Sequence, residues 1–136
     1  SLLFDGRTGE AFARRLAADG YELALVARRG EVLEQLAKQL VEAQGQQVWL
    51  YECNVTDGEG VKKVIDQAAE DMGGFDTLIH CAGILRTYHT HEMTFEQWHQ
   101  IIDINLNGTF YVNHAALPHL LKNRFSALVN CSSTQR

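Results

Sequence analysis

The sequence is poor in cysteine. Only three cysteines occur among its 136 residues, Cys53, Cys81 and Cys131, and they stand far apart with no paired spacing. This argues against a disulfide framework or a zinc site, and it fits a protein of the reducing cytosol. We therefore expect a cytoplasmic protein without a structural metal.

Long apolar runs and an excess of positive charge are also missing. No apolar stretch approaches the roughly 20 residues that a membrane-spanning helix needs. Lys and Arg number 12 against 17 Asp and Glu, a net charge of −5, whereas nucleic-acid-binding surfaces carry clustered basic patches. We expect neither a membrane nor a nucleic acid as partner. Hydrophobic residues make up 46% of the chain, enough for one packed core.

Repeats and low-complexity tracts are absent, and short apolar runs alternate with helical stripes. The apolar runs predict the strands Ser1–Phe4, Glu22–Ala27, Gln47–Glu52, Thr77–Ala82 and Ala127–Cys131. The stripes predict the helices Glu10–Asp19, Val32–Val41 ending near Gly45, Thr56 to Gly73–Gly74, and Thr94 to about Asn123. Thr56–Glu59 and Thr94–Gln97 have the capping-box pattern of a helix start. Such alternation, at about 30 residues per unit, predicts a doubly wound parallel sheet with helices on both faces.

Parallel sheets of this kind bind ligands at the carboxyl ends of their strands. Gly6 and Gly9 follow the first strand, where glycines let backbone amides approach a phosphate, although an ordinary glycine turn explains them equally well. Arg28 and Arg29 follow the second strand, and no Asp or Glu stands there. An arginine at this place accommodates a 2′-phosphate, which favours NADP(H) over NAD(H); the alternative is a solvated basic pair.

Further polar or small residues follow the remaining strands. Asn54 and Val55 follow the third strand, and Ala82 and Gly83 follow the fourth, where small residues let the backbone lie close to a flat ligand. Gly108 lies inside the long helix. Because glycine there costs about 1 kcal/mol relative to alanine, it indicates close packing or a functional constraint.

These segments, in this order, resemble the short-chain dehydrogenase/reductase family. Gly9–Gly20 resembles its first helix, Ala27-Arg28-Arg29 its NADP-preferring strand end, and Asn54–Asp57 its Asp-Val-Thr-Asp, whose first acid touches adenine. The remaining likenesses are His80–Gly83 to Asn-Asn-Ala-Gly, Asn105–Gly108 to Asn-x-x-Gly, and Leu128–Ser133 to the strand that ends in the catalytic serine. Asn54 is also able to hydrogen-bond an adenine amine.

The resemblance implies a Rossmann-like, three-layer α/β/α fold, incomplete at its C-terminal side. Residues 1–136 would form one dinucleotide-binding domain without the C-terminal catalytic and substrate segment. The implied activity is NADP(H)-dependent carbonyl reduction or alcohol oxidation of a small molecule by hydride transfer, in a homo-oligomer built through the 94–123 helix. The implied catalytic residues are Asn105 and Ser133; the cofactor-binding residues are Gly6, Gly9, Arg28, Arg29, Asn54, Val55, Ala82 and Gly83.

Three departures from the family pattern bear on activity. Aligned back from Gly9, Arg7 stands where the glycine motif has its middle glycine, and its side chain would either block or bind a diphosphate. The alternative alignment takes Gly6 as the first glycine and leaves the loop three residues too short. His80 and Cys81 replace two asparagines, and we expect each to keep a side-chain hydrogen bond. No Tyr-x-x-x-Lys occurs in the 136 residues, and a positioned general acid is worth about 10²–10⁴-fold in rate. The chain alone is therefore expected to be nearly inactive. The alternative function is a catalytically incompetent nucleotide- or partner-binding module.

Other candidates receive structural interpretations. His89 and His91 lie in a polar loop with no third ligand nearby, so a solvated loop is favoured over a metal site. Trp98, Ile101 and Ile102 are expected in the core. Cys81 and Cys131 are expected to be small buried hydrophobic residues.

Overall fold

Five parallel strands form one sheet. The computed structural model describes residues 1–4, 9–45 and 47–132, and within them the strand order is β3-β2-β1-β4-β5. The strands are β1 (Leu2–Phe4), β2 (Leu23–Ala27), β3 (Val48–Glu52), β4 (Thr77–His80) and β5 (Ala127–Asn130). The helices are α1 (Gly9–Ala18), α2 (Gly30–Gln44), α3 (Gly58–Met72), α4 (Phe95–Ile101) and α5 (Gly108–Leu120), with a π-helical segment, η1 (Ile102–Asn107), between the last two.

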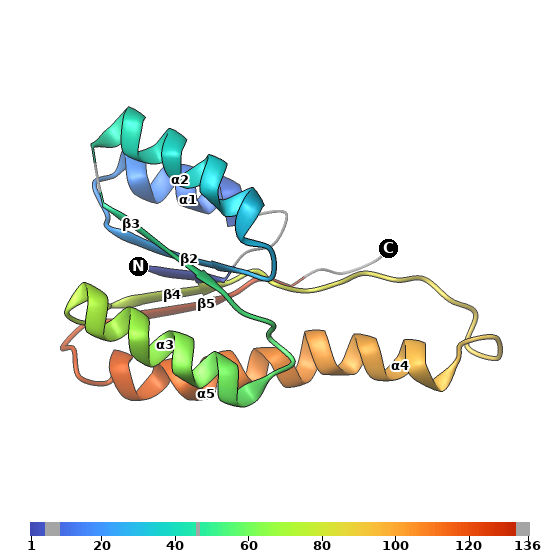
Figure 1. The fold of residues 1–136 in the computed structure, drawn as a ribbon. Helices are drawn as coiled ribbons and strands as arrows, with labels where there is room; N and C mark the ends of the chain where they lie inside the picture. Colours follow the sequence, from blue (N-terminus) through green and yellow to red (C-terminus); the bar gives the residue numbers. More distant parts are fainter. Residues whose placement is uncertain (5–8, 46, 133–136) are drawn as a thin grey trace.

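Helices cover both faces of this sheet. Figure 1 shows α1 and α2 on one face and α3 and α5 on the other. Every paired strand runs parallel to its neighbour, as crossover helices require. The prediction of a Rossmann-like, three-layer α/β/α fold is therefore confirmed. The short β1 lies at the centre of the sheet, although its sequence is the weakest strand candidate.

Alternating side chains of the central strands build two cores. Leu2 and Phe4 of β1 point to the α3/α5 side, where they pack in one buried cluster with Leu78. Leu3 points the other way and packs with Ile79 and residues of α1 and α2. Because successive side chains in a strand alternate between faces, a strand covered on both sides has few polar positions. The central strands are thus packed between two layers of helices.

Local signals set most of the helix boundaries. Gly45 and Gly73 end α2 and α3 in the left-handed conformation, at φ of 67° and 70°, where glycine carries no Cβ penalty. Thr94 and Gln97 form the predicted capping box at the start of α4. The predicted box at Thr56 is wrong. Asp57 is the N-cap of α3, and its Oδ1 accepts from the Gly60 amide at 3.1 Å, while the Thr56 hydroxyl donates to Asn54 instead.

The predicted long helix forms one continuous helical path, α4–η1–α5, in which a π-helical segment separates two α-helices. It begins at Phe95 and ends at Leu120, two residues after Pro118, but residues Ile102–Asn107 are π-helical. Such segments are rare and occur often at functional sites. The close packing predicted for Gly108 is present, because a Cβ there would lie 2.9 Å from Cγ2 of Val55. Within the described part of the chain, no helix is both long and apolar enough to cross a membrane.

The α4 end of this path projects from the sheet. Figure 1 shows α4 and the loop before it extending away from the strands. The prediction that Trp98 lies in the core is wrong, since its exposed fraction is 53%, and Ile101 and Ile102 are only half-buried. An apolar helical stripe predicts a covered face, yet no residue of α4 is buried.

Candidate functional site

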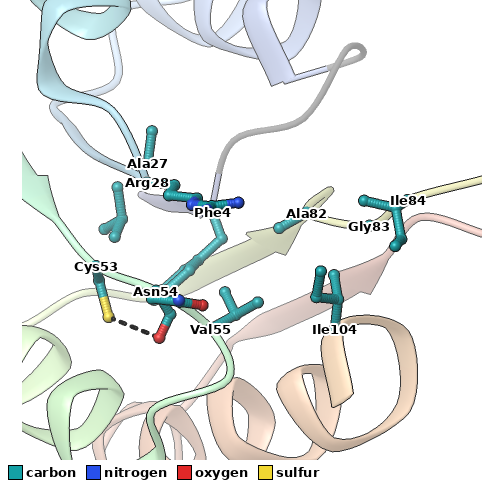
Figure 2. A pocket seen from close by; sticks show the side chains of 11 residues that line it. Phe4, Ala27, Arg28, Cys53, Asn54, Val55, Ala82, Gly83, Ile84 and Ile104 are labelled. Carbon is teal, nitrogen blue, oxygen red and sulfur yellow. Dashed lines mark hydrogen bonds between the residues drawn. The ribbon is translucent and has the colours of Figure 1, made fainter. Parts of the chain in front are cut away.

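A cavity of about 160 Å³ opens at the carboxyl ends of four strands. Figure 2 shows the side chains around it, which come from residues that end or follow β1, β2, β3 and β4 and from η1. Its lining residues are Phe4, Val26, Ala27, Arg28, Cys53, Asn54, Val55, Ala82, Gly83, Ile84 and Ile104. The chain order reverses between β1 and its two neighbours, β2 and β4. The cavity therefore lies at the switch point where α/β sheets bind ligands.

Five of the predicted cofactor-binding residues meet at this cavity. They share its wall although the sequence separates them widely, and they are Arg28, Asn54, Val55, Ala82 and Gly83. Phe4, Ile84 and Ile104 also line it and were not predicted as site residues. An apolar strand end and two isoleucines carry no chemical signal in a sequence, so only the sheet order reveals them.

Asn54 has its acceptor engaged within the chain. Its Oδ1 accepts from the Thr56 amide at 3.1 Å and from the Thr56 hydroxyl at 2.8 Å. A backbone N–H only donates, so the atom facing it is the oxygen, and both of its lone pairs are used. The Nδ2 donors are the group that remains for a ligand in the described structure. A ring nitrogen of adenine suits them better than the amine suggested by the sequence.

Two arginines and one glutamate surround the start of α2. Arg28 lines the cavity, and Arg29 is the N-cap of α2 but makes no side-chain capping bond. The first helical amide, Gly30 N, donates to Oε1 of Glu52 at 2.9 Å, and a Cβ at Gly30 would overlap that oxygen. A helix N-terminus attracts anions, so a carboxylate occupies this position. Glu52 was missed by sequence reasoning, because its contact depends on the start of α2 lying beside the end of β3.

Asn105 makes two side-chain hydrogen bonds to the backbone that follows β4. Its Oδ1 accepts from Ile84 N, and its Nδ2 donates to Ile84 O, both at 2.8 Å. A Cβ at Gly83 would lie 3.2 Å from the same Oδ1, so the glycine lets the two segments approach. The π-helical segment carries Asn105, and this paired contact holds the cavity wall formed by residues 82–84.

His80 is a buried imidazole. Its exposed fraction is 2%, and its ring packs edge-on against Phe4 with centroids 5.9 Å apart. Neither ring nitrogen has a hydrogen-bond partner in the described residues, so the bond expected there is not present. Burial lowers the pKa of His80 to about 4, because apolar surroundings disfavour the charged form. His80 is thus a neutral core residue beside the site.

Cys81 and Cys131 do not behave as two buried hydrophobic residues. Cys131 is exposed and Cys81 is half-buried, so that expectation is wrong. Their Sγ atoms are only 2.9 Å apart. The error arose because an apolar run predicts a strand but not its cover, and β5, which Cys131 follows, is exposed along its length. Strand pairing, rather than sequence spacing, brings the two side chains together.

Several predicted residues fall elsewhere. Gly6, Arg7 and Ser133 lie outside the described residues. Gly9 is the buried first residue of α1, and Ser132, which precedes the predicted catalytic serine, is exposed. Across ranges 1–4, 9–45 and 47–132, no three His, Cys, Asp or Glu side chains form a group able to hold a metal ion.

Comparison with known proteins gives a consistent result. A family model described as short chain dehydrogenase matches residues 6–136. The chain is 30% identical over 125 residues to a 3-oxoacyl-[acyl-carrier-protein] reductase of Staphylococcus aureus. The matched segment covers 92% of this chain and 51% of that protein. The chain therefore spans about half the length of the relatives it matches.

Solved structures agree in fold. An alcohol dehydrogenase from the archaeon Thermococcus sibiricus, complexed with 5-hydroxy-NADP, is similar with a TM-score of 0.87 and 32% identity, over 95% of this chain and 57% of that one. An NAD⁺-bound xylitol dehydrogenase is similar with a TM-score of 0.89 and 28% identity, over 95% and 50%. With the sheet order, the cavity at its switch point and the family match over nearly the whole sequence, the chain belongs to the short-chain dehydrogenase family.

Proposed function

We propose that this chain is the cofactor-binding front portion of an NADP(H)-dependent oxidoreductase that interconverts a small carbonyl compound and an alcohol. The observation that carries the proposal is the cavity at the switch point, lined by residues after β2, β3 and β4. Residues 1–136 act in it as a single dinucleotide-binding domain, and the cysteine content supports a cytoplasmic location.

The adenosine half of the nucleotide suits the wall formed by Arg28, Asn54 and Val55. Asn54 Nδ2 donates to an adenine ring nitrogen, and the apolar Val55 packs against the base. Arg28 and Arg29 receive a 2′-phosphate, which supports NADP(H) as the preferred cofactor. The two solved relatives differ here, one bound to an NADP derivative and the other to NAD⁺. The basic strand end of this chain favours NADP(H).

The nicotinamide half would lie next to residues 82–84, which line the cavity. Gly83 lets this segment approach Asn105 closely, since a Cβ there would lie 3.2 Å from Oδ1 of Asn105. A bound nicotinamide nucleotide supplies the hydride. Asn105 keeps the cavity wall in place through Ile84, and Ser133 orients the substrate oxygen by analogy with the family. No Tyr-x-x-x-Lys lies in the 136 residues to donate the proton, so this chain alone binds nucleotide with little turnover.

The long helical path supports a homo-oligomer. Large apolar side chains on it or directly after it are exposed, and these are Phe95, Trp98, Leu106, Phe110, Leu117 and Leu121. Exposed apolar patches of this kind mark interaction surfaces. Sedimentation analysis tests it: we expect a dimer that a Phe95→Glu/Phe110→Glu variant converts to monomer, and a wild-type monomer contradicts the proposal.

Titration with NADPH tests the proposed function. We expect nucleotide fluorescence to change on binding, and a generic ketone to cause almost no NADPH oxidation by the mass-verified chain. Rapid oxidation would contradict the role given to the missing tyrosine and lysine. A chain that binds no nucleotide favours the second candidate, a partner-binding module, for which the exposed apolar side chains of α4 and α5 are the supporting observation.

A further inference from the structure

Two cysteine thiols lie side by side at the edge of the sheet that carries the cavity. His80 and Asn130 are partners in the β4–β5 register, and the next amide, Cys131 N, donates to the carbonyl of His80 at 2.9 Å. The following pair in this register is Cys81 and Cys131. Their Sγ atoms are 2.9 Å apart although 50 positions separate them in the sequence. Sheet pairing therefore creates the contact.

Side-chain alternation places both sulfurs on one face. Leu78 packs in the cluster on the α3/α5 side, whereas Ile79 packs with α1 and α2. Cys81, two residues after Ile79, packs against that second cluster as well. Neighbours in register point to the same face of a parallel sheet, so Cys131 shares this face with Cys81.

The strand geometry suits a covalent link. Neighbouring strands lie about 4.7–4.9 Å apart, within the roughly 4.4–6.8 Å between Cα atoms that disulfides span. The exposed Cys131 is reachable by a small oxidant, and the half-buried Cys81 lies directly behind it. The third cysteine, Cys53, is different. Burial, and then the nearby Asp57 charge, raises the pKa of its thiol, which disfavours the reactive thiolate.

We propose that Cys81 and Cys131 form a thiol-oxidation site that reacts with a hydroperoxide and closes a reversible disulfide. The Cys131 thiolate attacks one peroxide oxygen and the O–O bond breaks. The leaving oxygen takes up the thiol proton, giving an alcohol or water, and Cys131 becomes a sulfenic acid. Sγ of Cys81 then attacks the sulfenic sulfur, the S–O bond breaks, and hydroxide leaves as water with the Cys81 proton. Two electrons pass from the two sulfurs to the peroxide.

The link would join two functional segments of the chain. Cys81 directly precedes Ala82 and Gly83 of the cavity wall, and Cys131 directly precedes Ser132. A disulfide fixes the spacing of these two strand ends, and a dithiol reductant releases it. The oxidation site does not depend on whether the cavity binds a nucleotide.

Oxidation with hydrogen peroxide, followed by thiol counting and non-reducing peptide mapping, tests the proposal. We expect the titratable thiols of the chain to fall from three to one, with a peptide that joins Cys81 to Cys131. The intact mass should fall by two hydrogens, and dithiothreitol should restore all three thiols. The matched control Cys53→Ser should still form the link, whereas Cys81→Ser and Cys131→Ser should not.

Three results would overturn the proposal. The first is oxidation of the cysteines to separate sulfinic or sulfonic acids without a linked peptide. The second is a link that involves Cys53, and the third is a link between two chains that increases with protein concentration. The wild-type peptide map decides between these outcomes even where a serine variant does not fold.

Discussion

The neighbouring strands β4 and β5 have the same length and a similar apolar sequence, but very different surroundings. Leu78 of β4 has an exposed fraction of 0%, whereas Leu128 of β5 has 37%. Strand β4 lies between β1 and β5, while β5 pairs with β4 alone in the described sheet. The cavity wall continues from the end of β4 through Ala82 and Gly83, whereas Cys131 and Ser132 follow β5 and are exposed. The two strand ends thus differ in packing as the strands themselves do.

Truncation of one leucine in each strand tests this difference in packing, and it should give the largest change in stability. Leu78→Ala should lower the free energy of unfolding by about 2–5 kcal/mol, since it leaves a cavity in a closed core. Leu128→Ala should cost about 1 kcal/mol or less, because solvent already reaches that side chain. Urea unfolding measures both. Equal losses would contradict the difference in packing between β4 and β5.

The buried His80 predicts a pH dependence of stability on the covered side. Its pKa is about 4 in the folded chain and 6.5 unfolded. The unfolded chain therefore binds the proton first, so stability is full above pH 6.5 and is lost as the pH falls toward 4. Between pH 7 and pH 5 the loss should be roughly 2 kcal/mol. Urea unfolding of the wild type and of His80→Asn checks this, because a stable variant should lose the dependence; an unchanged pH profile would count against it.

Arg28 should contribute to the affinity for NADPH but little to the affinity for NADH. Arg28→Ala is expected to weaken NADPH binding about tenfold or more, because a hydrogen bond to a charged group contributes about 1.5–3 kcal/mol. NADH, which lacks the 2′-phosphate, should bind nearly as before. Fluorescence titration of both cofactors measures the ratio, with Arg15→Ala on α1 as the charge-matched control. Equal weakening of both cofactors would remove Arg28 from 2′-phosphate recognition.

Glu52 should weaken NADPH binding, by a smaller factor than Arg28 strengthens it. Its carboxylate accepts from Gly30 N at the start of α2, and Arg28 and Arg29 directly precede that glycine. Glu52→Gln should strengthen NADPH binding about twofold to threefold, the size expected for a solvent-screened charge interaction. Glu42→Gln, at an exposed position further along α2, is the control. A ratio of NADPH to NADH affinity that does not change would show that Glu52 only caps the helix.

Much of the fold could be predicted because it depends on local patterns. Apolar runs predicted the five strands, and Gly73 ended its helix for the conformational reason given for it. The start of α3 was misplaced by one residue because Thr56 and Asp57 both carry cap-forming oxygens. The π-helical turn around Asn105 escaped prediction, since its apolar spacing differs little from that of an α-helix.

The features that escaped prediction depend on pairing between distant segments. The register of β4 against β5 sets the contact of Cys81 with Cys131, and no short-range pattern encodes it. The same holds for Glu52, whose role depends on the start of α2 lying beside the end of β3. Trp98 was misplaced because an apolar stripe predicts that a face is covered but not whether its cover lies within the same chain.

The central claim is that the cavity at the ends of β1, β2, β3 and β4 binds the adenosine part of NADP(H). Amide chemical shifts recorded while adenosine 2′,5′-bisphosphate is added test it most directly. The largest changes should fall on Arg28, Arg29, Asn54 and Val55, with little change in Ala127–Asn130 of β5. Changes centred on β5 or α4, or none at saturating ligand, would contradict the account.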